Sequence, residues 1–354
     1  MTTLSVYHQS LGGTLADDGI PLHYGDLKAE YDSALHGSVL LDRSHEGRIL
    51  LTGENRFELI NRMSTNNIMN MPLHEGRATV FTTPTARIMY RVVAYNRPDG
   101  LLIITEPGQG EAIANFLNRN IFYGDSVKLI NIQSQTTHFA LHGTTADFVM
   151  GEVQADLVDL PPLYSAELML NDATITVARR KSIVGSHWII ICKQEDAIAI
   201  HKQMLTIGEK YNLKPAGSLT YNTLRIRGGR PAGRELSQDY LPLEVGLWDE
   251  VSFNKGCYTG QEIIARMESR ERLAKTIVKL NLSSFVNAPA TIYDKDQAVG
   301  ILTSSVESPD GEFFAMAVIK TQLSKTQTVL AIGDNRVTAT VIGYVGQQPS
   351  FISE

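Results

Sequence analysis

Residues 253–266 read Phe-Asn-Lys-Gly-Cys-Tyr-Thr-Gly-Gln-Glu-Ile-Ile-Ala-Arg, and they carry the strongest fold signal in the chain. The pattern is that of a glycine-rich turn that leads into a helix. Gly256 and Gly260 permit positive φ angles and close backbone approach. Thr259, with Glu262 three residues later, fits a helix N-cap with its capping box. The stretch therefore predicts a loop that ends in a helix start near residue 260.

Cys257 is the candidate reactive group of this stretch. A helix N-terminus beside Lys255 attracts anions and so favours a thiolate over a thiol. Two plainer interpretations stay open: Glu262 serves only as a capping residue, and Cys257 is a small buried apolar side chain. The one other cysteine is Cys192. Two thiols can build neither a disulfide framework nor a four-thiolate metal site.

The composition excludes several classes of protein. The 354 residues include 32 Lys and Arg against 38 Asp and Glu, a net charge of −6, which argues against a general nucleic-acid binder but not against a local basic pocket. With 43% apolar and 20% charged residues, wholesale disorder is excluded. No apolar run approaches the roughly 18 residues of a membrane span. The first residues lack the pattern of a signal peptide, and the few cysteines fit a reducing compartment, so we expect a cytoplasmic protein.

Strand and helix patterns alternate through the first two thirds of the chain. Apolar residues at helical spacing predict helices at residues 54–63, 111–120 and 195–211. Strands are predicted at residues 48–53, 91–95, 101–105, 127–132, 137–141, 173–178 and 187–192. This mixture favours α+β layers over a purely parallel sheet.

The pattern changes after about residue 272. Short strands separated by turn residues are predicted at 276–282, 290–293, 299–306, 313–319, 328–332 and 336–343. Such spacing indicates a small antiparallel barrel or sandwich. We therefore predict two domains, residues 1–272 and residues 273–354.

Two further signals are weak. Gly108 and Gly110 follow a predicted strand, but the third glycine of a dinucleotide fingerprint is missing at Ile113. His138 and His142 are four residues apart in a predicted strand, so they do not share a helical face and no metal site is predicted.

Residues 255–262 resemble the signature Lys-Gly-Cys-(Phe/Tyr)-x-Gly-Gln-Glu of the YgfZ family. These are folate-binding proteins related to the glycine-cleavage T-protein, an aminomethyltransferase. The match covers Lys255, Gly256, Cys257, Tyr258, Gly260, Gln261 and Glu262. Weaker similarity to the same superfamily extends over residues 19–24, 41–48 with an Asp-x-Ser-His string, 64–67, 224–231, 242–247 and 300–318. The resemblance thus spans nearly the whole chain.

The resemblance implies a fold, a cofactor and a role. The fold is the T-protein-like folate-binding fold, α+β, with two α+β modules and a C-terminal antiparallel β-barrel around a central cavity. The cofactor is tetrahydrofolate, and the role is support of iron–sulfur cluster assembly or repair in client proteins. Cys257 is the expected catalytic residue, as a thiolate nucleophile, a redox-active thiol or a transient ligand. The alternatives are a folate-dependent aminomethyl- or methyltransferase of the T-protein group, and a scaffold with a vestigial pocket.

Three departures from the T-protein pattern affect the chemistry. Tyr90 and Arg91 replace two acids of a strand that supplies a carboxylate near the reactive folate nitrogen, and neither can stand in for an anion. Arg227 stands at the pterin-recognising Glu, although a guanidinium only donates hydrogen bonds. Asn67 replaces the acid of the Thr-Asn-Asp string. Aminomethyl transfer is therefore disfavoured.

The same resemblance gives the expected ligand contacts. The cofactor-binding residues are expected to be Asn67, Tyr90, Arg91, Arg227, Glu244 and Lys255. Acceptors that could replace the missing pterin-binding Glu are Glu244, Glu235 and Asp239. The substitutions predict a more positive pocket, suited to a folate polyglutamate tail or another anion, with contributions from Arg87, Arg91, Arg225, Arg227, Arg230 and Arg234. For Arg230 and Arg234, turn-rich and polar surroundings favour ordinary surface positions with ion pairs instead.

Overall fold

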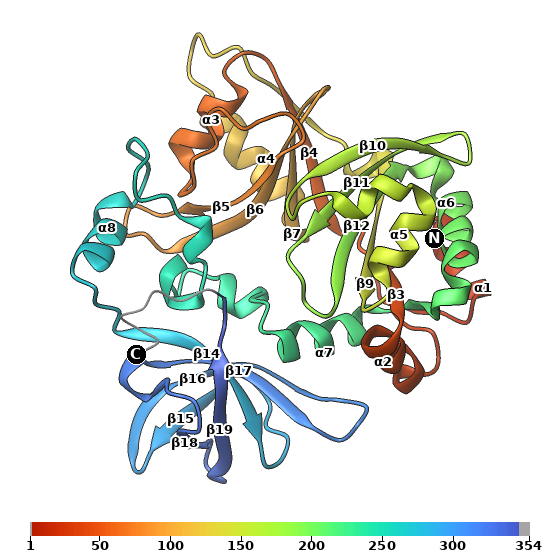
Figure 1. The fold of residues 1–354 in the computed structure, drawn as a ribbon. Helices are drawn as coiled ribbons and strands as arrows, with labels where there is room; N and C mark the ends of the chain where they lie inside the picture. Colours follow the sequence, from red (N-terminus) through yellow and green to blue (C-terminus); the bar gives the residue numbers. More distant parts are fainter. Residues whose placement is uncertain (1, 347–354) are drawn as a thin grey trace. The chain divides into compact units, whose positions relative to one another are not determined.

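The computed structural model describes residues 2–346, which form two compact units (Figure 1). Unit 1 comprises the residues up to Leu59, Ile68–Arg77 and Val92–Leu224. Unit 2 comprises Ile60–Asn67, Ala78–Arg91 and the residues from Arg225 on. Each unit has buried apolar clusters of its own. The division into domains of residues 1–272 and 273–354 stays a prediction.

Unit 1 contains a six-stranded sheet. Its strands are β3 (Ser38–Asp42), β9 (Thr136–Gly143), β10 (Ser165–Leu170), β11 (Ala173–Arg180), β12 (Ser186–Lys193) and β13 (Leu213–Ala216). They lie in the order β10-β11-β12-β9-β3-β13, antiparallel throughout except for the parallel pair β3 and β13. A two-stranded sheet pairs β1 (Thr14–Leu15) with β2 (Pro21–His23).

Helices accompany this sheet. They are α1 (Thr3–Ser10), α2 (Leu27–His36), α5 (Ala146–Val153) and α6 (Ala197–Gly208), with short 3₁₀ turns η1 (Gln133–Gln135), η2 (Ala155–Asp159), η3 (Gln194–Asp196) and η4 (Glu209–Tyr211). Trp188 and Ile190 of β12 pack in one cluster with Met150 of α5 and Met204 of α6, all fully buried. The Trp188 ring donates a hydrogen bond of 2.7 Å to Asp147, so its one polar atom is satisfied in the core.

A five-stranded sheet has the order β5-β6-β7-β4-β8. The strands are β4 (Glu46–Thr52), β5 (Gly76–Thr82), β6 (Ile88–Arg97), β7 (Gly100–Pro107) and β8 (Lys128–Asn131), and the accompanying helices are α3 (Arg56–Met63) and α4 (Gly110–Arg119). Residues of β5 and β6 are divided between the two units. Tyr90 and Arg91 of β6 belong to the part in unit 2.

The segment before the barrel is mostly helical turns. It contains α7 (Ser218–Gly228), η5 (Gly233–Leu236), η6 (Pro242–Val245), η7 (Trp248–Glu250) and α8 (Gln261–Ser269). One buried cluster joins Leu243 of η6, Tyr258 of the loop before α8, and Ile264 of α8. The loop before α8 is thus anchored by apolar side chains.

A closed antiparallel barrel follows, drawn in blue in Figure 1. Its strands are β14 (Lys275–Leu282), β15 (Ala290–Asp294), β16 (Gln297–Glu307), β17 (Phe313–Lys320), β18 (Val329–Ile332) and β19 (Val337–Tyr344), with η8 (Thr321–Leu323) after β17. The closed order is β14-β17-β16-β15-β18-β19. Val278 and Leu280 of β14 face the barrel core, whereas Ile277 joins a different cluster with Val245. This alternation is the period of two expected of a strand.

The architecture confirms the predicted α+β fold with a C-terminal antiparallel β-barrel. Each of the six predicted C-terminal strands has its counterpart in the barrel. Within residues 2–346, no helix has the length and apolar character needed to cross a membrane.

Candidate functional site

The start of α8 differs from the prediction. Gly260, not Thr259, is the N-cap residue, and its φ of 85° lies in the left-handed region where glycine is favoured. The Thr259 carbonyl accepts a hydrogen bond from the Thr82 hydroxyl at 2.5 Å. The Glu262 carboxylate accepts from Arg266 at 2.5 Å on the exposed face, so the predicted capping box is wrong. Gly256 has no positive φ and no neighbour within 4 Å of a Cβ position, so the expected need for glycine is not found there.

Lys255 has well-defined partners. Its ammonium donates to three backbone carbonyls, those of Asn61 at 2.5 Å, Ser64 at 2.7 Å and Asn66 at 2.8 Å. The nitrogen also lies 5.1 Å from the centroid of the Tyr258 ring. Burial lowers the pKa of Lys255 to about 8, because desolvation disfavours the charged form.

Further hydrogen bonds join the same two segments of unit 2. The Thr65 hydroxyl donates to the Glu250 carbonyl at 2.7 Å, and the Ser252 amide donates to the Thr65 carbonyl at 3.0 Å. The Asn66 side-chain amide donates to the Asp249 carbonyl at 3.2 Å. Residues 61–67 and 249–258 therefore form one hydrogen-bonded pair of segments, here called the loop pair.

Asn67 and Cys257 are the exposed side chains of the loop pair that the sequence singled out. The Asn67 amide donates to the Asn66 side-chain oxygen at 2.8 Å, which fixes its backbone. The other cysteine, Cys192 on β12, is buried, and burial raises the pKa of its thiol to about 12. A thiol reagent can therefore reach Cys257 in the native chain, whereas Cys192 is covered.

Arg91 is paired with an acid that the sequence analysis did not consider. Its guanidinium donates from Nε to both Glu250 oxygens, at 3.0 and 2.8 Å, and from Nη2 at 2.6 Å. The side chains are only 12% and 2% exposed. A bidentate pair of this kind fixes both groups in orientation. It also links Arg91 to the loop pair, because Glu250 belongs to it.

Tyr90 is the neighbour of Arg91 on β6 and is half-buried. Successive side chains of a strand point to opposite faces. Tyr90 and Arg91 thus cannot both face the Glu250 side of the strand. Tyr90 and Arg91, which replace the two acids of the T-protein pattern, therefore face different sides of the strand, and Arg91 is the one on the Glu250 side.

Glu244 and Arg227 lie at other points of unit 2. Glu244 is buried in η6, where its Oε2 accepts from the Leu241 amide at 2.9 Å and lies 3.6 Å from Arg87. Arg227 is half-buried at the end of α7, with its guanidinium carbon 5.6 Å from the centroid of the Phe314 ring. Glu244 thus already serves as a local cap, and part of its accepting capacity is used.

The predicted surplus of positive charge is wrong for three of the six arginines. Arg91 has Glu250, Arg87 has Glu244 at 3.6 Å, and Arg225 has Glu235 at 3.6 Å. Glu235 is fully buried and also accepts from the Ser304 hydroxyl at 2.6 Å. Arg234 is exposed, as its alternative interpretation held. Arg87 and Arg91 are balanced by acids from distant sequence positions, and Arg225 by an acid ten residues further along the chain.

Glu250 is the residue of the candidate site that the sequence analysis does not single out. Arginine at position 91 gave one usable signal, because a buried guanidinium requires a counter-charge. The acids at 235, 239 and 244 are the candidate pterin acceptors, and the Asp249-Glu250 pair just before the motif is not among the residues that the resemblance selects. Thr65 lies in the string 64–67 that resembles the superfamily, but its partner Glu250, 185 residues away, cannot be read from the sequence.

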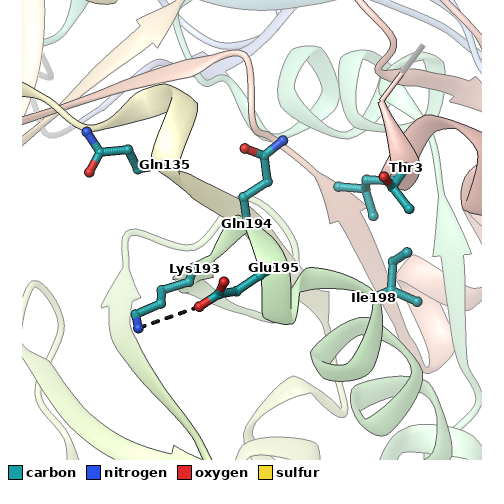
Figure 2. A pocket seen from close by; sticks show the side chains of 7 residues that line it. Thr3, Gln135, Lys193, Gln194, Glu195 and Ile198 are labelled. Carbon is teal, nitrogen blue, oxygen red and sulfur yellow. Dashed lines mark ion pairs between the residues drawn. The ribbon is translucent and has the colours of Figure 1, made fainter.

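Unit 1 holds cavities of its own, lined by both polar and apolar side chains. Figure 2 shows one of about 510 Å³, lined by Thr3, Leu4, Gln135, Lys193, Gln194, Glu195 and Ile198. Its Lys193–Glu195 ion pair, at 3.6 Å, is well exposed and therefore screened by water. Asp42, Ser44 and His45 of the Asp-x-Ser-His string line another cavity, of about 220 Å³. Among residues 2–346, no group of three or more His, Cys, Asp or Glu side chains is placed to hold a metal ion.

Comparisons with known proteins extend over most of the chain. Residues 19–255 match the family described as the GCVT N-terminal domain. A chloroplastic protein of Arabidopsis thaliana, whose name assigns it to the transferases, is 31% identical over 341 residues, which cover 96% of this chain and 77% of the relative. An aminomethyltransferase of Bacillus cytotoxicus is 24% identical over 353 residues and 96% of both chains. The glycine cleavage system aminomethyltransferase T from Bartonella henselae shares the fold, with a TM-score of 0.84 at 17% identity over 96% of both chains.

Proposed function

The chain belongs to the family of the GCVT N-terminal domain, and from that membership we propose that it is a tetrahydrofolate-binding protein. The proposed ligand contacts lie in unit 2, at Asn67, Tyr90, Arg91, Arg227, Glu244 and Lys255. The observation that supports this most is the loop pair. The residues of two separate family motifs are held together there by hydrogen bonds within the protein, so that this part of the site is preorganised before any ligand arrives.

The proposed cellular role is support of iron–sulfur cluster assembly or repair in client proteins. It rests on the similarity of residues 255–262 to the YgfZ signature. Cys257 is exposed on the loop pair, where a client could reach it. Two cysteines, one of them buried, are too few to hold a cluster by thiolates alone. Cys257 would therefore act as a nucleophile, a redox-active thiol or a ligand shared with the client.

A second candidate is a folate-dependent aminomethyl- or methyltransferase. It is favoured by the match to the Bacillus cytotoxicus aminomethyltransferase over nearly the full length of both chains. Against it stands the Arg91–Glu250 pair. A carboxylate close to the strand is present, but it is engaged by a guanidinium on three hydrogen bonds and is not available to a cationic aminomethyl group.

The two candidates are separated by a turnover assay with tetrahydrofolate and a lipoylated aminomethyl carrier. The proposed function predicts folate binding without turnover. Release of ammonia and methylene-tetrahydrofolate at a rate that depends on Arg91 and Glu250 would favour the transferase instead.

The contact at position 227 has its own test. A carboxylate accepts hydrogen bonds from the pterin edge, so Arg227→Glu should strengthen tetrahydrofolate binding if this position contacts the pterin. The matched control is Arg234→Glu, which makes the same charge change at an exposed arginine of unit 2. Calorimetric titration should show tighter binding only for Arg227→Glu. Weaker or unchanged binding would reject the correspondence.

A further inference from the structure

The Lys255 ammonium caps the C-terminal end of α3 and also donates hydrogen bonds to the loop that follows this helix. The last four carbonyls of a helix have no partner within the helix and carry a partial negative charge. In α3 (Arg56–Met63), the Ile60 carbonyl accepts from the Ser64 hydroxyl at 2.8 Å, and the Asn61 carbonyl accepts from Lys255 at 2.5 Å. The same ammonium then reaches the Ser64 and Asn66 carbonyls beyond the helix end.

These three contacts use the full donor capacity of the group. An ammonium has three N–H donors and no acceptor. The distances to the Ser64 and Asn66 carbonyls, 2.7 and 2.8 Å, are those of charge-assisted hydrogen bonds. A ligand anion could be contacted by this nitrogen only if one of these bonds were given up.

We propose that Lys255 is a positioning residue, which caps the end of α3 and thereby sets the backbone of residues 64–67 against the Cys257 loop. This inference rests on the proposed function and refines it at one position: Lys255 serves the site by placing Asn67 and Cys257, and this indirect role replaces the direct folate contact proposed for it above. Lys255 and Cys257 are two residues apart. The hydrogen bonds that hold Lys255 therefore also restrain the position of the Cys257 backbone.

The chemistry of the site selects lysine over arginine. Three carbonyls converge on one atom, which suits a compact charge with three rotatable donors. A guanidinium carries its five N–H donors on three nitrogens in one plane. It therefore cannot direct three donors from a single nitrogen at three surrounding carbonyls. Lys255→Arg should therefore fail to restore the arrangement, although it keeps the positive charge.

The test is chemical rescue, read out by amide hydrogen exchange. Lys255→Ala removes three carbons and the nitrogen, a shape that propylammonium matches. Exchange of residues 61–67 should accelerate at least about tenfold in Lys255→Ala. Propylammonium should slow it again, and propan-1-ol should not. The control Lys275→Ala, at an exposed lysine of unit 2, should leave exchange in this region unchanged.

Two outcomes would overturn the inference. One is unchanged exchange of residues 61–67 in Lys255→Ala, and the other is equal rescue by propan-1-ol, which would assign the effect to packing. If Lys255→Ala does not fold, Lys255→Met keeps the aliphatic stem without the donors, and faster exchange confined to the loop pair is then required.

Tetrahydrofolate affinity is measured separately on the same variants. It should fall in Lys255→Ala and recover with propylammonium. An unmodified chain that binds no tetrahydrofolate would contradict the proposed function, while the exchange measurement, which uses no folate, would still decide the role of Lys255.

Discussion

Arg91 and Glu250 form a buried ion pair between residues 159 positions apart in the chain. Taking two charges out of water is costly, and their attraction offsets the cost only when the hydrogen bonds are well made. Here three hydrogen bonds connect the two side chains, so their attraction offsets the desolvation cost as long as both are present. Loss of one member leaves the other buried without its counter-charge.

Glu250→Gln should therefore destabilise the protein by about 3 to 5 kcal/mol. The double variant Arg91→Met with Glu250→Met should cost less than the sum of its single changes, because no charge is left behind. Urea unfolding of Arg91→Met, Glu250→Met and the double variant measures this coupling. Additive costs would show that the two side chains do not depend on each other.

The two cysteines should differ sharply toward iodoacetamide. Cys257 is exposed, whereas Cys192 is buried and the pKa of its thiol is raised to about 12. In the native protein Cys257 should be labelled and Cys192 should stay protected until the chain unfolds. Peptide mass mapping after a timed pulse measures both sites. Labelling of Cys192 at a comparable rate would contradict the burial of β12.

The residues of the site could be predicted from the sequence more readily than their hydrogen-bond and ion-pair partners. The Lys-Gly-Cys stretch was visible because its spacing is distinctive. The three carbonyls that Lys255 contacts lie near 190 positions away, and a backbone carbonyl has no residue signature. The charge balance failed at Arg91 for the same reason, since Glu250 reaches it only through the fold.

At the level of elements, the start of α8 depends on a glycine. A Cβ at Gly260 would lie 2.8 Å from both the Ala86 Cα and the Thr83 carbonyl oxygen, and the φ of 85° disfavours any other residue. The helix is thus begun by backbone conformation and not by a side-chain cap. Thr259 and Glu262 looked like a cap in sequence because capping residues are also common in ordinary turns.

Gly260→Ala should therefore cost about 1 to 3 kcal/mol. Glu262→Gln should cost less than about 0.5 kcal/mol, because Glu262 forms only an exposed pair with Arg266. Denaturant unfolding of the two variants distinguishes the observed helix start from a capping box. A loss above about 1 kcal/mol for Glu262→Gln would restore the capping interpretation.

The helix with the clearest periodicity was predicted, and so were the largely buried strands β7 and β12, whereas the buried strand β3 was not. The helix predicted at residues 195–211 is α6 with a 3₁₀ turn at each end. All five residues of β3 are buried, so the alternation that identifies a half-exposed strand is absent there. The short strand β13 pairs with it in parallel, across a separation that local patterns do not report.

At the level of the whole molecule, buried histidines link stability to pH. Burial lowers the pKa of His138 and of His201 to about 3, so both rings stay neutral in the folded chain. In the unfolded chain they take up protons below about pH 6.5. The unfolded state then binds more protons, and stability falls as the pH falls from about 6.5 toward 3.

Each of these histidines should contribute up to about 1.4 kcal/mol of lost stability per pH unit in that window. His138→Gln, which cannot titrate, should flatten the pH dependence by one such contribution, whatever its effect at pH 7. Urea midpoints measured from pH 7 to pH 4 for both proteins provide the comparison. Parallel curves would show that His138 is protonated in the folded chain.

The whole-molecule fold followed from strand spacing and family resemblance together. The barrel was predicted from short strands and turns, and its closure was left open between barrel and sandwich. Closure depends on β14 pairing with both β17 and β19, a long-range fact of the fold. The cytoplasmic location and the iron–sulfur clients stay predictions.

The most direct test of the central claim is a calorimetric titration of the full chain with tetrahydrofolate under reducing conditions. We expect saturable binding of one folate per chain. Binding should be weaker in Glu250→Gln, which releases Arg91 from the loop pair. A titration that gives only heats of dilution, at folate concentrations well above the cellular range, would contradict the claim that this member of the family binds a reduced folate.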